Sequence, residues 1–333
     1  MRLPVVDLAA GAERAVARAL REASATHGFF YVAGHGVARE VVAEAFAEME
    51  GFFEDSQAKK ACAGAFRGYV GLFEQGDYGV DESDVRQERA PGSAAAEKLL
   101  VGEQPLDFKE MFHFGTTLPR SHEMFHDLLF APNVWPPQRP RFREALQTYY
   151  NAVLGLSDEM LQLFALSLDL PKRYFVDMAR STPMNSMNCV HYPPLSAFPK
   201  HERPLSEAQL GIGAHTDFEA VTLLSQHGPT DACLDILVDG AWHPVPPLAD
   251  HFVVNVGDML ARASGDIFRS TVHRARNHAT QHRFSIAFFR APDFDANISP
   301  RDIAAPRRQY EPLQAGVHML RRVAKANEPN LIS

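Results

Sequence analysis

The segment Gly213–Phe218 contains the first candidate for chemistry, a histidine and an aspartate separated by one residue. On a β-strand, residues i and i+2 project from the same face, so His215 and Asp217 point the same way with Cβ atoms about 7 Å apart. An imidazole and a carboxylate, each with a metal bond of about 2.0–2.2 Å, can converge on one ion across that gap. The chain has 15 histidines, so a single His-x-Asp can arise by chance, and an exposed polar strand end remains the alternative.

A second histidine, His273, follows in the β-branched segment Ser270–Arg274. A histidine in such a segment is often a hydrogen-bonded core group, which is the alternative for His273 alone. Two histidines and one carboxylate together form the facial triad of non-haem iron(II) oxygenases, which leaves positions open for a bidentate co-substrate and O₂. The sequence therefore favours iron ligation by His215, Asp217 and His273.

The strand expected from Arg283 onward alternates cleanly between polar and apolar residues. Its parity places Arg283 and Ser285 on one face, and Phe284, Ile286 and Phe288 on the other. An arginine that faces the inside of a barrel needs an anion, because an unpaired buried charge is very costly. The planar guanidinium suits a carboxylate, and the neighbouring hydroxyl adds another donor. A solvent-facing pair is the alternative, which the order of the three elements in one β-rich half disfavours.

Composition narrows the classes of partner. The 333 residues carry a formal net charge of −8 with no basic cluster, which argues against nucleic acid or an anionic membrane and favours a small-molecule substrate. The three cysteines, Cys62, Cys189 and Cys233, form neither a C-x-x-C motif nor a disulfide framework, which indicates a reducing compartment. We see neither a signal peptide at the start nor an apolar run of about 18 residues, so we expect a cytoplasmic location.

The elements that must position these residues are short strands in the second half of the chain. Short β-rich runs separated by turns are expected at 184–192, 210–216, 220–226, 233–238, 252–256, 269–274 and 283–290. Strands this short and evenly spaced are typical of a sandwich or barrel. Residues 61–118 lack sustained periodicity, which favours short strands or a functional lid. We predict one domain over 1–333, with a helical and mixed part at about 1–180, a jelly-roll core at about 184–292 and a final helix at about 313–326.

The motifs, in their order along the chain, resemble the isopenicillin N synthase-like family of 2-oxoglutarate/Fe(II)-dependent dioxygenases. The resemblance runs essentially from end to end, and such an ordered set is far more specific than a lone His-x-Asp. It is carried by Leu3–Leu8, His27–Val37, Arg67-Gly68-Tyr69, His191-Tyr192-Pro193-Pro194, His215-Thr216-Asp217, His273, Arg283-x-Ser285 and Tyr310-Glu311-Pro312. The fold implied is mainly β with flanking helices, a distorted double-stranded β-helix or jelly roll.

The resemblance also implies roles for individual residues. His215, Asp217 and His273 would bind Fe(II), while Arg283, Ser285 and Tyr192 would bind the distal carboxylate of 2-oxoglutarate, with O₂ as co-substrate. The expected reaction is hydroxylation of an amino acid or natural-product intermediate with release of succinate and CO₂. Desaturation, ring closure and ethylene formation occur in the same family and stay open. A jelly-roll metal-binding protein or isomerase without O₂ chemistry is the alternative from another class, which the Arg283/Ser285 pair disfavours.

Six residues are candidates for contact with the primary substrate, and of these we favour Tyr69 and Asn188. The six are Tyr69, Phe73, Asn188, Glu219, Arg262 and Phe289. Four positions depart from the family pattern near the expected substrate site, namely Asn188, Val190, Glu219 and Ala263. They indicate either an unusual substrate or neutral drift, and taken singly each of the six candidates is more often a packing or surface residue than a substrate contact.

Overall fold

Two mainly antiparallel sheets form the centre of the fold in the computed structural model, which describes residues 1–64, 66–75, 106–125, 127–198 and 210–331. The larger sheet has the order β1 (Val5–Asp7), β2 (Phe29–Ala33), β10 (Phe252–Val256), β7 (Val221–His227), β12 (Arg283–Arg290), β5 (Ser186–Tyr192), β4 (Glu110–Gly115) and β3 (Gly68–Val70). The smaller sheet has the order β6 (Ile212–His215), β11 (His273–Ala275), β8 (Leu234–Val238) and β9 (Ala241–Val245). The β1–β2 pair is parallel, and the other pairs are antiparallel. Short antiparallel strands in two sheets, flanked by helices, agree with the expected jelly roll.

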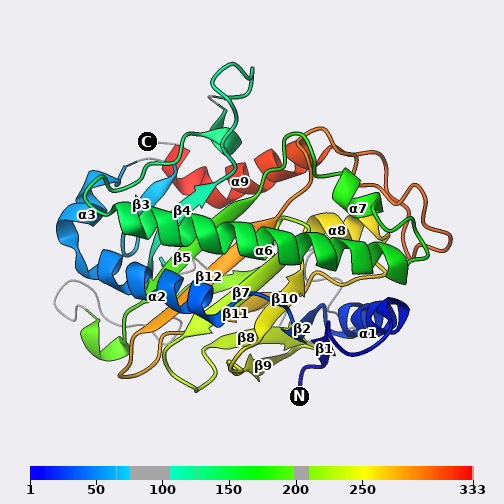
Figure 1. Ribbon diagram of the computed structural model, residues 1–333, viewed down its shortest axis with the longest axis horizontal. Coiled ribbons are helices and arrows are strands. Elements are labelled where there is room, and N and C mark those ends of the chain that lie inside the picture. Colours follow the sequence, from blue (N-terminus) through cyan, green and yellow to red (C-terminus); the bar gives the residue numbers. More distant parts are fainter. Residues whose placement is uncertain (65, 76–105, 126, 199–209, 332–333) are drawn as a thin grey trace.

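Some of the helices, with α6 (Pro140–Ser167) at their centre, cover one face of the larger sheet. The helices are α1 (Glu13–Thr26), α2 (Arg39–Glu54), α3 (Ser56–Ala61), α6 (Pro140–Ser167), α7 (Tyr174–Asp177), α8 (Asp258–Ala263) and α9 (Ala315–Leu331), with 3₁₀ turns at η1 (Leu128–Phe130) and η2 (Leu195–Ala197). The long helix α6 crosses the sheet and contacts α1, α2, β7 and β12 (Figure 1). Its Phe142 stacks on Phe52 of α2, with ring centroids 4.5 Å apart, and meets Phe112 of β4 edge-on. These buried rings make the helix-facing side of the larger sheet the main hydrophobic core.

The register of the central strands decides which residues face away from those helices. Strand β12 pairs with β5, so that Arg283 lies opposite Tyr192 and Ser285 opposite Val190. Ile286 and Phe288 point to the helical side, where both are fully buried in the main core. The alternation predicted for this strand is therefore confirmed, and its polar members face the smaller sheet.

Most predicted strands match the structure closely, and β10 and β12 match at both ends. Strand β11 starts at His273, four residues later than expected, and neither β9 nor α8 was predicted. The stretch 61–118 does contain the short strands β3 and β4, whereas 76–105 lies outside the described residues. Within the described part of the chain, every helix is too short or too polar to cross a membrane. The division into one domain stays a prediction.

Candidate functional site

The pairing of β6 with β11 brings two histidines together. His215 ends β6 and lies opposite His273, the first residue of β11, with ring centroids 4.2 Å apart. Asp217 follows two residues after His215, and its Oδ1 is 3.7 Å from Nε2 of His215 and 3.6 Å from Nε2 of His273. One donor atom from each residue lies within 4.8 Å of the other two. Two metal bonds of about 2.1 Å can span donor separations up to about 4.2 Å, so the pairs that involve Asp217 can share one cation.

Hydrogen bonds behind the three side chains fix which atoms face inward. Nδ1 of His215 lies 2.8 Å from the Gly213 carbonyl, and Nδ1 of His273 lies 3.1 Å from the Thr271 carbonyl. Because a carbonyl only accepts, both imidazoles carry their proton on Nδ1 and present the Nε2 lone pair to the centre. The outer oxygen of the aspartate, Oδ2, accepts hydrogen bonds from Asn255 and Thr222, at 2.6 and 2.5 Å. These contacts leave Oδ1 of Asp217 facing the two imidazoles.

The protonation states suit a metal site. Burial, reinforced by His273, lowers the pKa of His215 to about 3, so its imidazole is neutral at physiological pH. Burial opposes ionisation of Asp217, but the two histidines and its hydrogen bonds outweigh that effect and leave its pKa below the ordinary value. Neutral imidazoles and an ionised carboxylate are the forms that bind a metal.

A cationic anchor lies at one end of the same inner face. Arg283 is buried and donates from Nη2 to Oε1 of Gln226 at 2.8 Å, while its Cζ lies 4.4 Å from the ring centre of Tyr192. Burial raises the pKa of the Tyr192 hydroxyl, and the neighbouring Arg283 and Ser285 oppose that rise. Nη1 of Arg283 is buried and has no partner among the described residues. A buried guanidinium with an unused donor fits an incoming carboxylate.

Sequence comparisons agree with this geometry. A family described as the 2OG-Fe(II) oxygenase superfamily matches residues 184–292, and one described as non-haem dioxygenase in morphine synthesis N-terminal matches residues 3–138. The 2-oxoglutarate-dependent dioxygenase citB of Monascus ruber is 30% identical over 336 residues, covering 96% of this chain and 94% of that protein. The chain belongs to the 2OG-Fe(II) oxygenase superfamily. It is an enzyme that depends on Fe(II) and 2-oxoglutarate and uses O₂.

Other members of the superfamily resemble this oxygenase over most of its length. Clavatol oxidase claD of Penicillium crustosum is 30% identical over 318 residues, covering 90% of this chain and 88% of that protein. The crystal structure of a full-length Neurospora crassa protein in complex with alpha-KG superposes with a TM-score of 0.75 at 24% identity, covering 97% of this chain and 96% of that chain. The solved structure confirms the fold, which is the jelly roll expected from the sequence.

The residues of the oxygenase fit the cofactor and co-substrate of its superfamily. A cavity of about 600 Å³ between the two sheets is lined by His215, Asp217 and His273 and also by Arg283. Hence the three converging donor residues and the arginine with the unpartnered Nη1 line one cavity. The cavity wall also includes Met319 from α9, so the last helix closes part of it.

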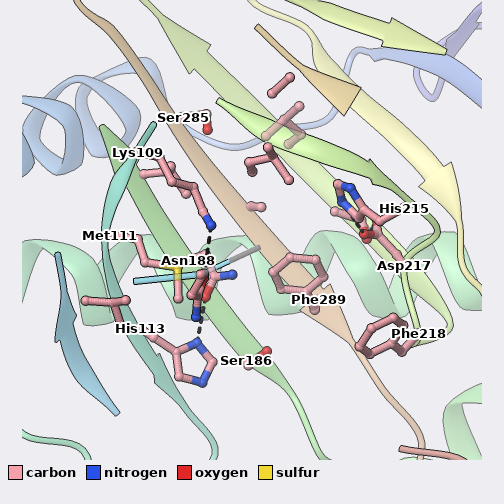
Figure 2. A pocket seen from close by; sticks show the side chains of 18 of the residues that line it. Lys109, Met111, His113, Ser186, Asn188, His215, Asp217, Phe218, Ser285 and Phe289 are labelled. Atoms are coloured by element: carbon pink, nitrogen blue, oxygen red, sulfur yellow. Dashed lines mark hydrogen bonds and ion pairs between the residues drawn. The ribbon is translucent and has the colours of Figure 1, made fainter. Parts of the chain in front are cut away.

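Four of the six predicted substrate contacts line this cavity. They are Phe73, Asn188, Glu219 and Phe289. Figure 2 shows Asn188 on the wall opposite His215 and Asp217, with the ring of Phe289 between them in that view. Burial, together with the neighbouring Asp217, raises the pKa of Glu219 to about 8. The substrate roles of these residues stay predictions.

The prediction that Tyr69 and Arg262 line the cavity is wrong. Tyr69 lies on the helical face of the larger sheet, where its hydroxyl donates to Glu110 at 2.6 Å, because the register of β3 turns Val70 inward instead. Arg262 of α8 stacks over the ring of Tyr310 at 4.3 Å and lies outside the cavity lining. Of the positions that depart from the family pattern, Ala263 also lies outside that lining, whereas Val190 belongs to it.

Several residues at the site were not singled out from the sequence. Asn255 and Thr222 donate to Oδ2 of Asp217, the carboxylate expected to bind the metal. His113 of β4 and Lys109, the residue before β4, line the cavity. Arg322 of α9 donates to Oγ1 of Thr216 at 2.9 Å, between two of the candidate ligands. A polar residue inside an apolar strand, as in Phe252–Val256, is the signal that could have revealed Asn255.

Proposed function

We propose that His215, Asp217 and His273 hold Fe(II), and that Arg283 and Ser285, with Tyr192, hold the distal carboxylate of 2-oxoglutarate. The observation that carries this proposal is the buried Nη1 of Arg283, which lacks a partner in the described chain and lies in the same cavity as the three converging donors. A 2-oxoglutarate molecule has a carboxylate at each end, so one end can reach the guanidinium while the keto-acid end reaches the metal position.

The chain itself contributes binding, orientation and a protected cavity. When bound, iron(II) with 2-oxoglutarate supplies the oxidising chemistry: substrate C–H, 2-oxoglutarate and O₂ become substrate C–OH, succinate and CO₂. Asn255 and Thr222 keep the Asp217 carboxylate oriented, and the Nδ1 contacts hold both imidazoles with Nε2 inward. Residues that orient metal ligands through hydrogen bonds typically raise the metal affinity tenfold to a hundredfold.

The substrate we infer is a small molecule, and the default reaction is hydroxylation. Relatives are named for such substrates, for example the homoarginine-6-hydroxylase of Glycine max, 27% identical over 321 residues and covering 92% of this chain and 88% of that protein. A cavity of about 600 Å³ suits a small molecule better than a polymer. We also infer a role in natural-product metabolism and a cytoplasmic location, the latter supported by three buried free cysteines.

The proposal is tested by mixing the protein anaerobically with Fe(II) and 2-oxoglutarate. A weak visible charge-transfer band should appear as the keto acid chelates the iron. In Arg283→Ala the same band should need about a hundredfold more 2-oxoglutarate, because a buried charge-assisted contact is worth roughly 3 kcal/mol.

Exposed Arg141 on α6 supplies the matched control, and Arg141→Ala should titrate like the wild type. Absence of the band at saturating 2-oxoglutarate would end the co-substrate assignment. An unchanged titration in folded Arg283→Ala would remove Arg283 from the anchor while leaving the metal ligands untouched.

A further inference from the structure

The buried cations of the described chain differ in whether an acidic side chain neutralises them. Five lysine and arginine residues are buried there, namely Arg67, Lys109, Arg283, Arg290 and Arg322. Three of them form ion pairs with aspartates: Lys109 with Asp107 at 2.8 Å, Arg290 with Asp158 at 2.7 Å and Arg322 with Asp258 at 3.6 Å. The two without a carboxylate partner among the described residues, Arg283 and Arg67, both line the large cavity. A buried charge without a counter-ion is costly, so we expect each of these two to meet an anion supplied by a ligand.

Neutral groups alone hold Arg67 within the described part of the chain. Nη1 donates to the Thr116 carbonyl at 2.7 Å and to Oδ1 of Asn133 at 3.1 Å, and Nη2 donates to the Leu129 carbonyl. Nε is buried and has no hydrogen-bond partner there. Burial lowers the pKa of Arg67 to about 10, so the guanidinium remains charged at physiological pH. The cavity wall thus contains a full positive charge that the described residues leave uncompensated.

The strand register places this charge far from the co-substrate anchor. A side chain at Gly115 of β4 would begin 2.9 Å from Nη2 of Arg67, so the guanidinium lies directly over Gly115. Gly115 pairs with Ser186 of β5, whereas Arg283 lies opposite Tyr192, six positions further along β5. Six residues of an antiparallel strand span about 20 Å. One 2-oxoglutarate molecule is far too short to neutralise both arginines, so Arg67 requires a different anion.

Hydrogen-bond donors face the cavity beside this position. Ser186 lines the cavity, and its hydroxyl has no partner among the described residues. In the next register row, Oδ1 of Asn188 lies 2.6 Å from Nδ1 of His113, which leaves Nδ2 of Asn188 as a further donor. Figure 2 shows Ser186 and Asn188 on the wall opposite the candidate metal ligands. Burial, reinforced by the charge of Arg67, lowers the pKa of His113 to about 4, so the positive potential of Arg67 extends over this wall.

We propose that Arg67, together with the hydroxyl of Ser186, binds a carboxylate group of the primary substrate. One guanidinium with a few neutral donors matches a singly charged carboxylate better than a phosphate dianion. This inference rests on the proposed function, because it names the substrate class of the same cavity. The carboxylate belongs to the molecule that is oxidised and is distinct from both carboxylates of 2-oxoglutarate.

The sheet register also indicates how such a substrate extends toward the metal position. Ser186 of β5 pairs with Phe289 of β12, which in turn pairs with Thr222 of β7. The hydroxyl of Thr222 donates to Asp217. Gly115 and Thr222 therefore lie in one row, three strand spacings or about 14 Å apart. In Figure 2 the ring of Phe289 lies between these two sides of the cavity, so we expect an apolar scaffold between the carboxylate and the carbon that is oxidised.

The test measures binding to the anaerobic protein loaded with Fe(II) and saturating 2-oxoglutarate, by calorimetry. The probes are benzoate, 2-naphthoate and 3-phenylpropanoate, each against its primary amide and against the amine of the same scaffold, with phenylphosphonate as the more highly charged arm. We expect at least one carboxylate to bind about tenfold or more tightly than its amide, because only the carboxylate neutralises the guanidinium. The amines should bind more weakly still.

Variants then assign the preference to Arg67. Arg67→Gln removes the charge and should weaken carboxylate binding about tenfold or more, while amide binding stays within about threefold of the wild type. Arg67→Lys keeps the charge and should retain more of the preference than Arg67→Gln does. Ser186→Ala removes one donor and should weaken carboxylate binding about threefold or more. Arg141→Gln, at an exposed position on α6, is the matched control and should have no effect.

The outcomes separate this inference from the proposed function. The visible band recorded on the same samples reports iron and 2-oxoglutarate binding and also shows that each variant is folded. If the band forms but no carboxylate binds more tightly than its amide, or an amine or the phosphonate binds best, the carboxylate assignment is overturned. A carboxylate that abolishes the band would overturn it too, because that probe would bind in place of 2-oxoglutarate.

The variants give the remaining decisions. An unchanged carboxylate preference in folded Arg67→Gln removes Arg67 from the substrate site. If Arg67→Gln does not fold, Ser186→Ala decides, and unchanged carboxylate binding in that variant overturns the proposed site. If the wild type gives no band, the proposed function itself fails.

Discussion

The same strands form both faces of the larger sheet, but the polar side chains on the two faces differ in how completely they are hydrogen-bonded. On the helical face, Glu110 of β4 accepts from Nζ of Lys59 at 3.0 Å and from the hydroxyl of Tyr69 at 2.6 Å, and its other oxygen lies 2.7 Å from Nδ1 of His191. Nε2 of His191 in turn lies 2.7 Å from Nδ1 of His282. This network is closed within the protein, and its members belong to the packing of the fold.

On the face toward the smaller sheet, polar side chains keep unused hydrogen-bonding atoms. Nη1 of Arg283, Nδ2 of Asn188 and Nε2 of His113 lack partners among the described residues, and all three side chains line the cavity. Buried polar atoms are costly unless they are paired, so unpaired ones in a folded protein point to a ligand. The comparison of these two clusters teaches that the cavity-facing side chains keep unused hydrogen-bonding atoms, whereas the side chains around Glu110 use theirs on one another.

The largest effect that this comparison predicts is at the metal site. Asp217→Ala removes the one carboxylate among the three converging donors. Fe(II) affinity should fall by more than about a hundredfold, because loss of a ligand should exceed the largest effect of losing a residue that only orients one. O₂-dependent succinate release should also be lost. The measurement is metal binding by dialysis together with succinate formation. Asp295→Ala, at an exposed position, should retain both.

Because Asp217 faces a cavity instead of the core, its variant should remain folded. A thermal unfolding temperature within a few degrees of the wild type, with metal binding lost, would agree with a ligand role. Retained turnover in Asp217→Ala would remove this residue from the ligand set and weaken the distinction between the faces.

The next effect belongs to the helical face and concerns stability. Glu110→Gln keeps the shape of the side chain but removes the charge that three donors share, so the free energy of unfolding should fall by about 3 kcal/mol. Urea denaturation measures this loss, with exposed Glu144→Gln on α6 as the matched control. The 2-oxoglutarate titration should be unchanged. A shifted titration would show that the two faces are coupled.

The same carboxylate predicts a pH dependence. Burial raises the pKa of Glu110, but the hydrogen bonds from His191, Tyr69 and Lys59 outweigh it and leave the pKa below its usual 4.5. A carboxylate with a depressed folded pKa stabilises the protein above its unfolded pKa and loses that contribution as the pH falls through the folded value. The wild type should therefore lose stability more steeply below about pH 4.5 than Glu110→Gln does.

Where strand parity could be read, the sequence predicted correctly which side chains share a face and line the cavity. The one-residue spacing in His215-x-Asp217 and in Arg283-x-Ser285 predicts a shared face, and the structure places each pair in the same cavity. Both pairs lie in or beside strands with clear β character, so the register was set by the hydrophobic alternation of their neighbours. The pairing of β6 with β11, which brings His273 beside His215, could not be predicted from local periodicity, since a contact across two strands leaves none. His273 was singled out by its residue type, as the second histidine of a possible facial triad.

The failures come from segments without such alternation. Strand β3 has only three residues, too few to show an alternation, so the sequence could not indicate that Val70 faces the cavity and Tyr69 does not. His113 was missed for a related reason, because β4 lies in the stretch that showed no sustained period. The helix α8 was not predicted, so nothing in the sequence indicated that Arg262 lies outside the cavity. The first backbone amides of α8 donate to carbonyls of the segment that begins at Asp217. For example, the Asp258 amide donates to the Asp217 carbonyl at 2.8 Å. A contact between positions so far apart in the sequence leaves no local pattern.

The smallest predicted effect is at the residue whose face was predicted wrongly. Tyr69→Phe removes one of three hydrogen bonds to Glu110 and leaves the aromatic packing intact, so the free energy of unfolding should fall by about 1 kcal/mol. Urea denaturation measures the loss, and titrations with 2-oxoglutarate and with any substrate should match the wild type. A weaker substrate titration with unchanged stability would mean that Tyr69 reaches the cavity in solution, as the motif suggested. A small loss of stability alone would show that a polar side chain with a complete set of partners contributes to the fold and does not contact the substrate.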